Sequence, residues 1–225
     1  GDLIRAIDKI DDIERVRYMT SHPRDMTFEM IDAMAESSKV VRHMHLPVQH
    51  GSNEMLKKMN RGYTIEHFKE LLSYVRSKMP DIVVTTDLIT GFPGETEEDY
   101  LKTEELVKKA DFASAFTFVY SKRSGTRAAE MPDQIPEEVS KDRIMRLVAL
   151  VNSLTRQKSE KYVGKLTEIL CEDYDEKKKT YLGRDEFGRM AYFPYPENII
   201  GKFVQVKVES ANGISLTGTV EKIED

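Results

Sequence analysis

One alternation constrains the fold more than any other feature of this chain. Short apolar runs such as IVVTTDLI (82–89) and FASAFTFVY (112–120) are separated by longer segments such as TIEHFKELLSYVRSKM (64–79). In the longer segments apolar side chains recur every three or four residues, which predicts amphipathic helices, whereas the short runs are typical of buried strands. Strands that alternate with helices in this way form right-handed βαβ units, so the sequence predicts an α/β fold with a parallel sheet.

The same pattern continues to about residue 160. Further strands are predicted at 15–20 and 43–49, and further helices at 27–37, 95–110 and 136–162. Thr64 is a favourable N-cap for the helix that follows it. Beyond residue 160 the pattern changes to short strand candidates separated by turn residues such as Asn212 and Gly213, which favours a small all-β barrel. We therefore expect two domains, at 1–159 and 160–225.

Composition excludes several classes of protein. The 225 residues carry a net charge of -5, so the chain has no overall basic field for nucleic acid. No apolar run reaches the roughly 18 residues of a membrane span, and the first residues lack the apolar stretch of a secretory signal. We expect a cytoplasmic protein without a membrane partner. Cys171 is the single cysteine, which excludes an intramolecular disulfide and an all-cysteine metal site within this chain.

Polar residues gather where the predicted strands end, which is where parallel α/β folds bind ligands. Gly91 and Gly94 in TDLITGFPGET permit a tight turn ahead of a helix whose free N–H groups could bind a carboxylate or phosphate. Asp87 lies inside the apolar strand, where an acid is costly unless it is paired or faces a site. After the last strand, Arg123 could meet an anionic group of a ligand.

Three histidines lie in HMHLPVQH (43–50). His43 and His45 share one face of the predicted strand and could bind zinc together with Asp87, as in a metallohydrolase. They lie at the beginning of the strand, however, so we favour hydrogen-bonded histidines at a strand entry. Gln49, His50 and Ser52 lie at the opposite end and offer donors and acceptors suited to a ribose or an amino-acid group.

The all-β part interleaves cations with aromatic rings, a combination that suits RNA. The alternative is a solvated loop beside core aromatics, because residues 160–225 carry more acidic than basic side chains. The predicted RNA-binding residues are Lys177, Lys178, Lys179, Tyr181, Arg184, Arg189 and Tyr192.

Five ordered motifs carry a resemblance to a known family: TSHP, HLPVQHGSNEMLKKMNRGYT, TTDLITGFPGETEEDY, FTFVYSKRSGTRAAEMPDQIP and GRMAYFP with IGKFVQVKVESANGISLTGTV. Over almost its whole length the chain resembles the methylthiotransferase family of radical S-adenosylmethionine enzymes, in particular the branch that acts on tRNA. The resemblance implies a partial (β/α) radical-SAM barrel followed by an OB-like TRAM barrel that binds RNA.

The resemblance also implies cofactors and a reaction. The family binds S-adenosylmethionine on a [4Fe–4S] cluster, uses a second such cluster for sulfur insertion, and adds a 2-methylthio group to isopentenyladenosine at position 37 in the anticodon region of tRNA. It implies that Gln49, His50 and Ser52 contact the ribose or methionine part of the cofactor, and that Ile89, Gly91, Val119 and Tyr120 lie near its adenine. The complete predicted cofactor-binding set is Gln49, His50, Ser52, Asp87, Ile89, Gly91, Glu95, Val119, Tyr120 and Arg123.

One departure from the family is large. The family's C-x-x-x-C-x-x-C cluster motif and its three further cysteines are absent from this sequence. We therefore expect a C-terminal fragment that lacks the N-terminal domain and the first two barrel strands, binds no cluster and is inactive by itself. Its exposed sheet edge favours a dimer. Alternatives are an enzyme that methylthiolates a ribosomal protein, one that acts on threonylcarbamoyladenosine in tRNA, and an RNA-binding module without catalysis.

Overall fold

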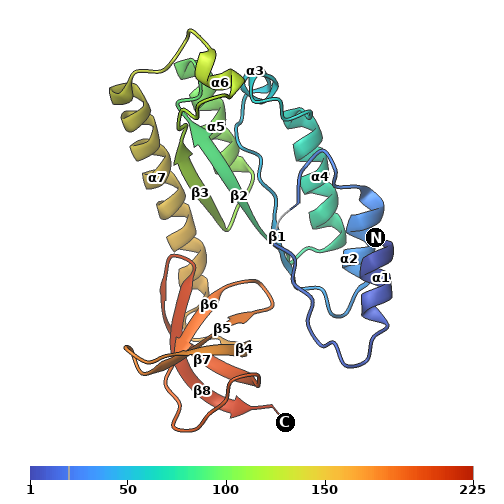
Figure 1. The fold of residues 1–225 in the computed structure, drawn as a ribbon. Helices are drawn as coiled ribbons and strands as arrows, with labels where there is room; N and C mark the ends of the chain where they lie inside the picture. The colour runs from blue at the N-terminus through green and yellow to red at the C-terminus, as the bar shows by residue number, and fades with distance from the viewer. Residues whose placement is uncertain (20, 225) are drawn as a thin grey trace. The chain divides into compact units, whose positions relative to one another are not determined.

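The computed structural model describes residues 1–19 and 21–224 (Figure 1). The chain divides into two compact units. The first comprises Gly1–Val40 and Met44–Val151, and the second comprises Val41–His43 and Asn152–Asp225. The domain boundary expected at residue 160 stays a prediction.

The first unit contains a parallel sheet in the order β1-β2-β3. Its strands are β1 (His43–His45), β2 (Val83–Thr90) and β3 (Ser114–Val119). Its helices are α1 (Asp2–Asp8), α2 (Phe28–Glu36), α3 (Asn53–Lys58), α4 (Ile65–Lys78), α5 (Glu97–Lys109), α6 (Arg127–Glu130) and the start of α7 (Glu137–Ser159). The parallel register of β2 and β3 confirms the predicted α/β architecture.

Helix starts follow from the sequence. The side chains of Thr27, Thr64 and Thr96 each accept a hydrogen bond from a backbone N–H in the first turn of α2, α4 and α5. Each threonine satisfies a donor that would otherwise lack an intrahelical partner. Thr96 forms a reciprocal capping box with Asp99, so α5 begins two residues later than the predicted position 95.

Two sequence-based expectations are wrong in part. Residues 15–19 form no regular strand but a single bridge between Val16 and Val40, and Thr20 lies outside the described residues. The predicted strand 43–49 is regular only over 43–45, because Pro47 has no N–H for the ladder and the chain bulges around it. Helix α3 was not foreseen, since its six residues are too short to show a period.

The second unit contains the predicted all-β barrel. After the 3₁₀ turn η1 (Glu160–Tyr162), the strands are β4 (Leu166–Asp175), β5 (Thr180–Asp185), β6 (Met190–Phe193), β7 (Phe203–Asn212) and β8 (Ser215–Ile223). They close in the order β4-β5-β6-β8-β7. Every second residue of β5 and β6 is buried, and Tyr181, Ala191 and Phe193 among them share a hydrophobic core with Ile169, Val204 and Leu216. Within the described residues, no helix is long and apolar enough to cross a membrane.

Candidate functional site

A bulge shapes the end of the segment that follows β1. Between Leu46 and Gln49 the ladder with β2 opens, and the buried Thr86 hydroxyl fills the gap. That hydroxyl accepts from the Val48 N–H at 3.0 Å and donates to the Leu46 carbonyl at 2.8 Å. Pairing resumes where the Gln49 N–H donates to the Asp87 carbonyl at 2.9 Å. Gln49 has a φ of 69°, so the chain turns at this residue.

The next side chain enters a closed network. His50 is fully buried, and its Nδ1 accepts from the Ser52 N–H at 3.0 Å. Its Nε2 lies 2.9 Å from Oε1 of Glu95, which is also buried. Because Nδ1 accepts a hydrogen bond, we assign the neutral-ring proton to Nε2, which then donates to the carboxylate. Both ring nitrogens of His50 therefore have protein partners.

Arg143 of α7 completes this network. Its Nη1 lies 2.7 Å from Oε2 of Glu95 and 3.0 Å from the Glu95 carbonyl. The same Oε2 accepts from the Gly91 N–H at 2.8 Å. An isolated buried carboxylate is strongly unfavourable, so the guanidinium and the other donors permit Glu95 to be buried here. The sequence reading missed Arg143, although its position four residues before Leu147, on the apolar stripe of the helix, was a signal.

Ser52 links the network to the start of α5. Its hydroxyl donates to Oδ1 of Asp99 at 2.6 Å, while Oδ2 of Asp99 accepts from the Thr96 hydroxyl at 2.7 Å. Burial raises the pKa of Asp99, but hydrogen bonds from Ser52 and Thr96 together lower it below its ordinary value. The carboxylate form therefore stabilises this loop.

A hollow of about 410 Å³ lies at the C-terminal ends of β2 and β3. It brings together Gly91, Val119 and Tyr120 of the predicted set. Gly91 has a φ of +72°, and a Cβ there would lie 2.5 Å from Oγ of Ser140. Within the described residues, the buried hydroxyls of Thr90 and Tyr120 have no hydrogen-bond partner. Arg123 is exposed and does not line this hollow.

Asp87 and Ile89 lie elsewhere, on the open face of the sheet. Burial alternates along β2, and these two residues belong to the partly exposed set. Their register partners on β3 are Phe116 and Phe118, whose side chains are 53% and 50% exposed. His45 joins the face. Its Nδ1 lies 2.9 Å from the Thr85 hydroxyl and its Nε2 lies 3.3 Å from Oδ1 of Asp87.

The ring of His45 also meets Phe116 edge to face, with centroids 5.9 Å apart. His45 is thus the hydrogen-bonded histidine that its place at the strand entry predicted. Within residues 1–19 and 21–224, no three His, Cys, Asp or Glu side chains gather as a metal site.

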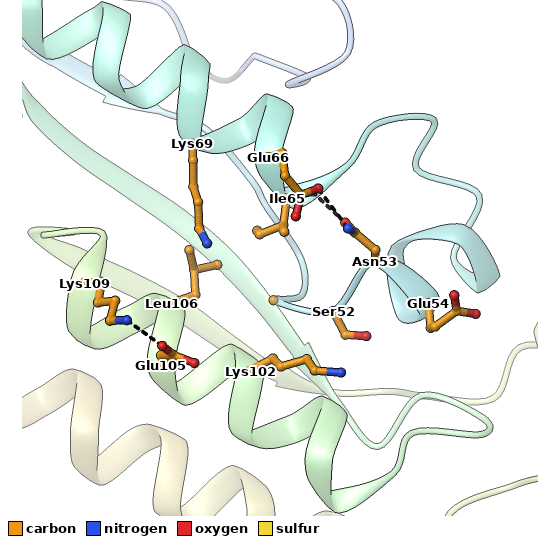
Figure 2. A pocket seen from close by; sticks show the side chains of 11 residues that line it. Ser52, Asn53, Glu54, Ile65, Glu66, Lys69, Lys102, Glu105, Leu106 and Lys109 are labelled. Atoms are coloured by element: carbon orange, nitrogen blue, oxygen red, sulfur yellow. Dashed lines mark hydrogen bonds and ion pairs between the residues drawn. The ribbon is translucent and has the colours of Figure 1, made fainter.

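A second hollow, of about 290 Å³, lies between α3, α4 and α5 (Figure 2). Asn53 joins two of these helices, because its amide donates to Glu66 at 2.8 Å and its carbonyl oxygen accepts from the Ile65 N–H at 2.7 Å. Three lysines and three glutamates line the hollow, so it carries no net charge to attract an anion. Ser52 is the one predicted site residue among its lining side chains.

In the barrel, the predicted RNA-binding residues separate into two groups. Tyr181 lies in the core, and Arg189 is buried, paired with Asp185 at 2.6 Å, and stacked 3.4 Å from the ring centroid of Tyr162. Both side chains therefore pack against other residues of the protein. The residues that remain partly or fully exposed are Lys177, Lys178, Lys179, Arg184 and Tyr192.

Within that exposed group, the Lys178 ammonium lies 4.9 Å from the centroid of the Tyr192 ring. Arg184 forms an ion pair with Glu172 on the neighbouring strand. A cation beside an aromatic ring is a combination suited to a phosphate and a base, so RNA binding by these five residues stays a prediction.

Comparison with known proteins gives two family matches. Residues 1–107 match the model described as the radical SAM superfamily, and residues 160–220 match the TRAM domain. Among curated proteins, the tRNA-2-methylthio-N(6)-dimethylallyladenosine synthase of Thermoanaerobacter sp. (strain X514) is 45% identical over 98% of this chain and 47% of its own length. The protein of the same name from Pelotomaculum thermopropionicum is 46% identical over 97% of this chain and 49% of its own length.

The chain thus spans about half the length of the curated relatives it matches. Among solved structures, coproporphyrinogen III oxidase from Escherichia coli, described as a radical SAM enzyme, aligns with a TM-score of 0.49 and 18% identity. That alignment covers 82% of this chain and 44% of the oxidase chain.

Proposed function

We propose that this chain is part of a tRNA methylthiotransferase of the MiaB type. Two family matches support this proposal, to the radical SAM superfamily over residues 1–107 and to the TRAM domain over residues 160–220. The proposed reaction adds a 2-methylthio group to an N6-isopentenyl adenosine of tRNA. The observation that carries the proposal is 45% identity to a synthase of that modification over 98% of this chain, through both modules.

We propose that S-adenosylmethionine binds at the C-terminal ends of β2 and β3. The left-handed turn at Gly91 and the unpartnered hydroxyl of Tyr120 fit a ligand with both polar and apolar parts. When bound, that cofactor would supply the methyl group and the radical that activates the substrate. In this proposal His50, Ser52 and Glu95 do not contact the cofactor. Their polar atoms are hydrogen-bonded to protein partners, and this network holds the Gly91 turn in place.

The iron–sulfur clusters do not fit the residues present. A [4Fe–4S] cluster requires cysteine thiolates, and the one cysteine, Cys171, is buried in the barrel. Burial raises the pKa of the Cys171 thiol to about 11, which keeps it protonated near neutral pH. We propose that cluster ligands come from outside these 225 residues, and that this chain alone does not catalyse the reaction.

For RNA, we propose that the barrel contacts the anticodon arm through Lys177, Lys178, Lys179, Arg184 and Tyr192. Their cations suit phosphates, and the Tyr192 ring suits an unstacked base. The free edge of the sheet, in the order β1-β2-β3, remains a proposed pairing surface for a second copy.

The proposal is tested in a longer protein that contains this chain and supplies cluster ligands. Given S-adenosylmethionine, a sulfur source and tRNA bearing N6-isopentenyladenosine, the expected product is the 2-methylthio nucleoside, detected by mass spectrometry of digested tRNA. A parallel reaction with ribosomal proteins is the control. Methylthiolation of a protein in place of the tRNA, or no product with either substrate, would contradict the proposal.

RNA binding is tested separately on the 225-residue chain. We expect affinity for tRNA that falls with increasing salt, because cations on the barrel displace counterions from phosphates. Changing Lys177 and Lys179 together to Ala should lower the salt slope by about two, while changing Lys57 and Lys58 of α3 to Ala should leave it unchanged. Binding of tRNA without any methylthio product from the longer protein would favour the RNA-binding module instead.

A further inference from the structure

The open face of the sheet carries side chains that the S-adenosylmethionine site proposed above does not use. Asp87 and Phe116 are register partners in the middle of β2 and β3, and Ile89 and Phe118 are the next pair toward the strand ends. Two phenyl rings that are about half exposed, on one face of one strand, are costly to leave in water. Their position beside a carboxylate distinguishes them from scattered apolar residues.

The Asp87 carboxylate is oriented but not fully used. Its Oδ1 lies 3.3 Å from Nε2 of His45, and His45 is in turn held by the Thr85 hydroxyl at 2.9 Å. The Asp87 side chain remains 25% exposed, so a second oxygen can accept a hydrogen bond on the open face. The fixed histidine prevents the carboxylate from rotating freely, which gives that acceptor a defined direction.

We propose that this face binds the target adenine of the RNA, with the purine ring stacked on Phe116 and its exocyclic N–H donated to Asp87. Neighbouring parallel strands lie about 4.8 Å apart, so a ring on Phe116 has its edge within reach of the adjacent carboxylate. The inference rests on the proposed tRNA function and names residues that select its substrate.

The same face accounts for an alkyl group on that nitrogen. An N6-alkylated adenine keeps one N–H, which can be donated to the Asp87 carboxylate, whose Oδ1 contacts His45. The next register pair, Ile89 and Phe118, lies about 6.6 Å along the strands and presents apolar surface. A five-carbon substituent spans that distance, so burial of the substituent against Phe118 adds to the stacking on Phe116.

The test titrates the 225-residue chain with N6-isopentenyladenosine and follows binding by NMR. We expect saturable binding that Phe116→Leu weakens about tenfold, because leucine keeps apolar surface but cannot stack. Asp87→Asn should weaken binding about tenfold as well, since the charged acceptor is lost. Phe28→Leu is the matched control, because Phe28 is 40% exposed on α2.

Two further ligands identify what is recognised. N6-methyl-N6-isopentenyladenosine lacks the N–H but keeps the five-carbon group, and it should bind about tenfold more weakly than N6-isopentenyladenosine. S-adenosylhomocysteine carries the adenine of the cofactor, and its affinity should not change in Phe116→Leu. If Phe116→Leu lowered the affinity for S-adenosylhomocysteine instead, the face would bind the cofactor and the inference would be overturned.

The inference also fails if the wild-type chain binds no nucleoside at millimolar concentration, or if Phe116→Leu behaves as Phe28→Leu does. Equal thermal unfolding midpoints show that the variants remain folded. None of these readouts depends on catalysis, so they separate this inference from the proposed function. A chain that binds tRNA but shows no dependence on Phe116 overturns only the inference, whereas absence of the 2-methylthio product in the longer protein overturns the function.

Discussion

This protein contains two histidine–carboxylate pairs, and their histidines are only five positions apart in the sequence. The pairs have the same chemical groups but differ in burial and in their neighbours. His50 and Glu95 have side chains that are 0% exposed and 2.9 Å apart, with Arg143 against the far oxygen of the carboxylate. The side chains of His45 and Asp87 are 14% and 25% exposed and 3.3 Å apart, and the ring of Phe116 lies beside them. The first pair is closed by protein on all sides, and the second faces open surface.

The difference teaches that a polar cluster near a strand end need not touch a ligand. Both ring nitrogens of His50 and both oxygens of Glu95 have partners within the protein, so the pair holds the Gly91 turn. Asp87 keeps an accessible oxygen, which a ligand can use. A closed pair contributes mainly to folding and an open pair mainly to binding, and the following predictions test that division.

The largest expected effect is on the closed pair. Arg143→Met should lower the free energy of unfolding by about 3–5 kcal/mol, because it leaves the Glu95 carboxylate buried without its cation. Denaturant unfolding measures the change. Arg146→Ala, one turn along the same helix, is the control and should cost within about 1 kcal/mol, because its ion pairs are partly exposed. Equal effects in the two variants would show that the network is not closed.

A smaller loss is expected at the turn that the closed pair supports. Gly91→Ala should destabilise by about 2–3 kcal/mol, since an L residue is strained at a φ of +72° and the new Cβ would lie 2.5 Å from Oγ of Ser140. The double variant Gly91→Ala with Ser140→Gly should recover the steric part of that loss. Gly125→Ala, which has a φ of +76° but no neighbour within 4 Å, isolates the backbone part.

The link from Ser52 to Asp99 should show a defined pH dependence. Ser52→Ala should cost about 1–2 kcal/mol near neutral pH, because a hydrogen bond to a carboxylate is lost. The pKa of Asp99 is lower in the folded protein than its ordinary 3.8, so this stabilisation is complete above that value and disappears as pH falls through the folded-state pKa. Unfolding curves between pH 7 and pH 2 measure it, with exposed Ser77→Ala as the control. A difference that grows on acidification would contradict the assignment.

The smallest effect on stability is expected at the open pair. His45→Gln should change the free energy of unfolding by less than about 1 kcal/mol, because the pair is partly solvated. The same variant should lower the affinity for N6-isopentenyladenosine, because Asp87 loses the histidine that orients its carboxylate. Thermal unfolding and nucleoside titration on one sample make the comparison. A loss of stability as large as that of Arg143→Met would show that His45 and Asp87 also contribute mainly to folding, which would contradict the proposed difference between the two pairs.

Much of the fold could be predicted from local patterns. The spacing of Ile65, Phe68, Leu72 and Val75 predicted α4, and all four side chains are buried. Short strands separated by turn residues were expected after residue 160, and Asn212 and Gly213 lie at the turn between β7 and β8. These features depend on neighbours within a few positions, so the sequence displays them directly.

Less of the candidate site could be predicted. The sequence placed His50, Ser52 and Glu95 in a cofactor site, but their partners lie about forty to fifty positions away along the chain. Arg143 was not foreseen at all, and Tyr181 and Arg189 turned out to be buried. Whether a polar side chain is closed or open depends on what packs over it, and periodicity carries no information about that.

The sequence by itself determined the longer helices and most of the strands, that the first sheet is parallel, and that a small barrel follows. The tertiary structure alone decided which histidine is enclosed and which faces open surface, because burial and ion pairing result from contacts between distant segments. His45 and His50 are five positions apart with the same kind of partner. Only the packing of α7 against the Gly91 turn makes one structural and leaves the other available to a ligand.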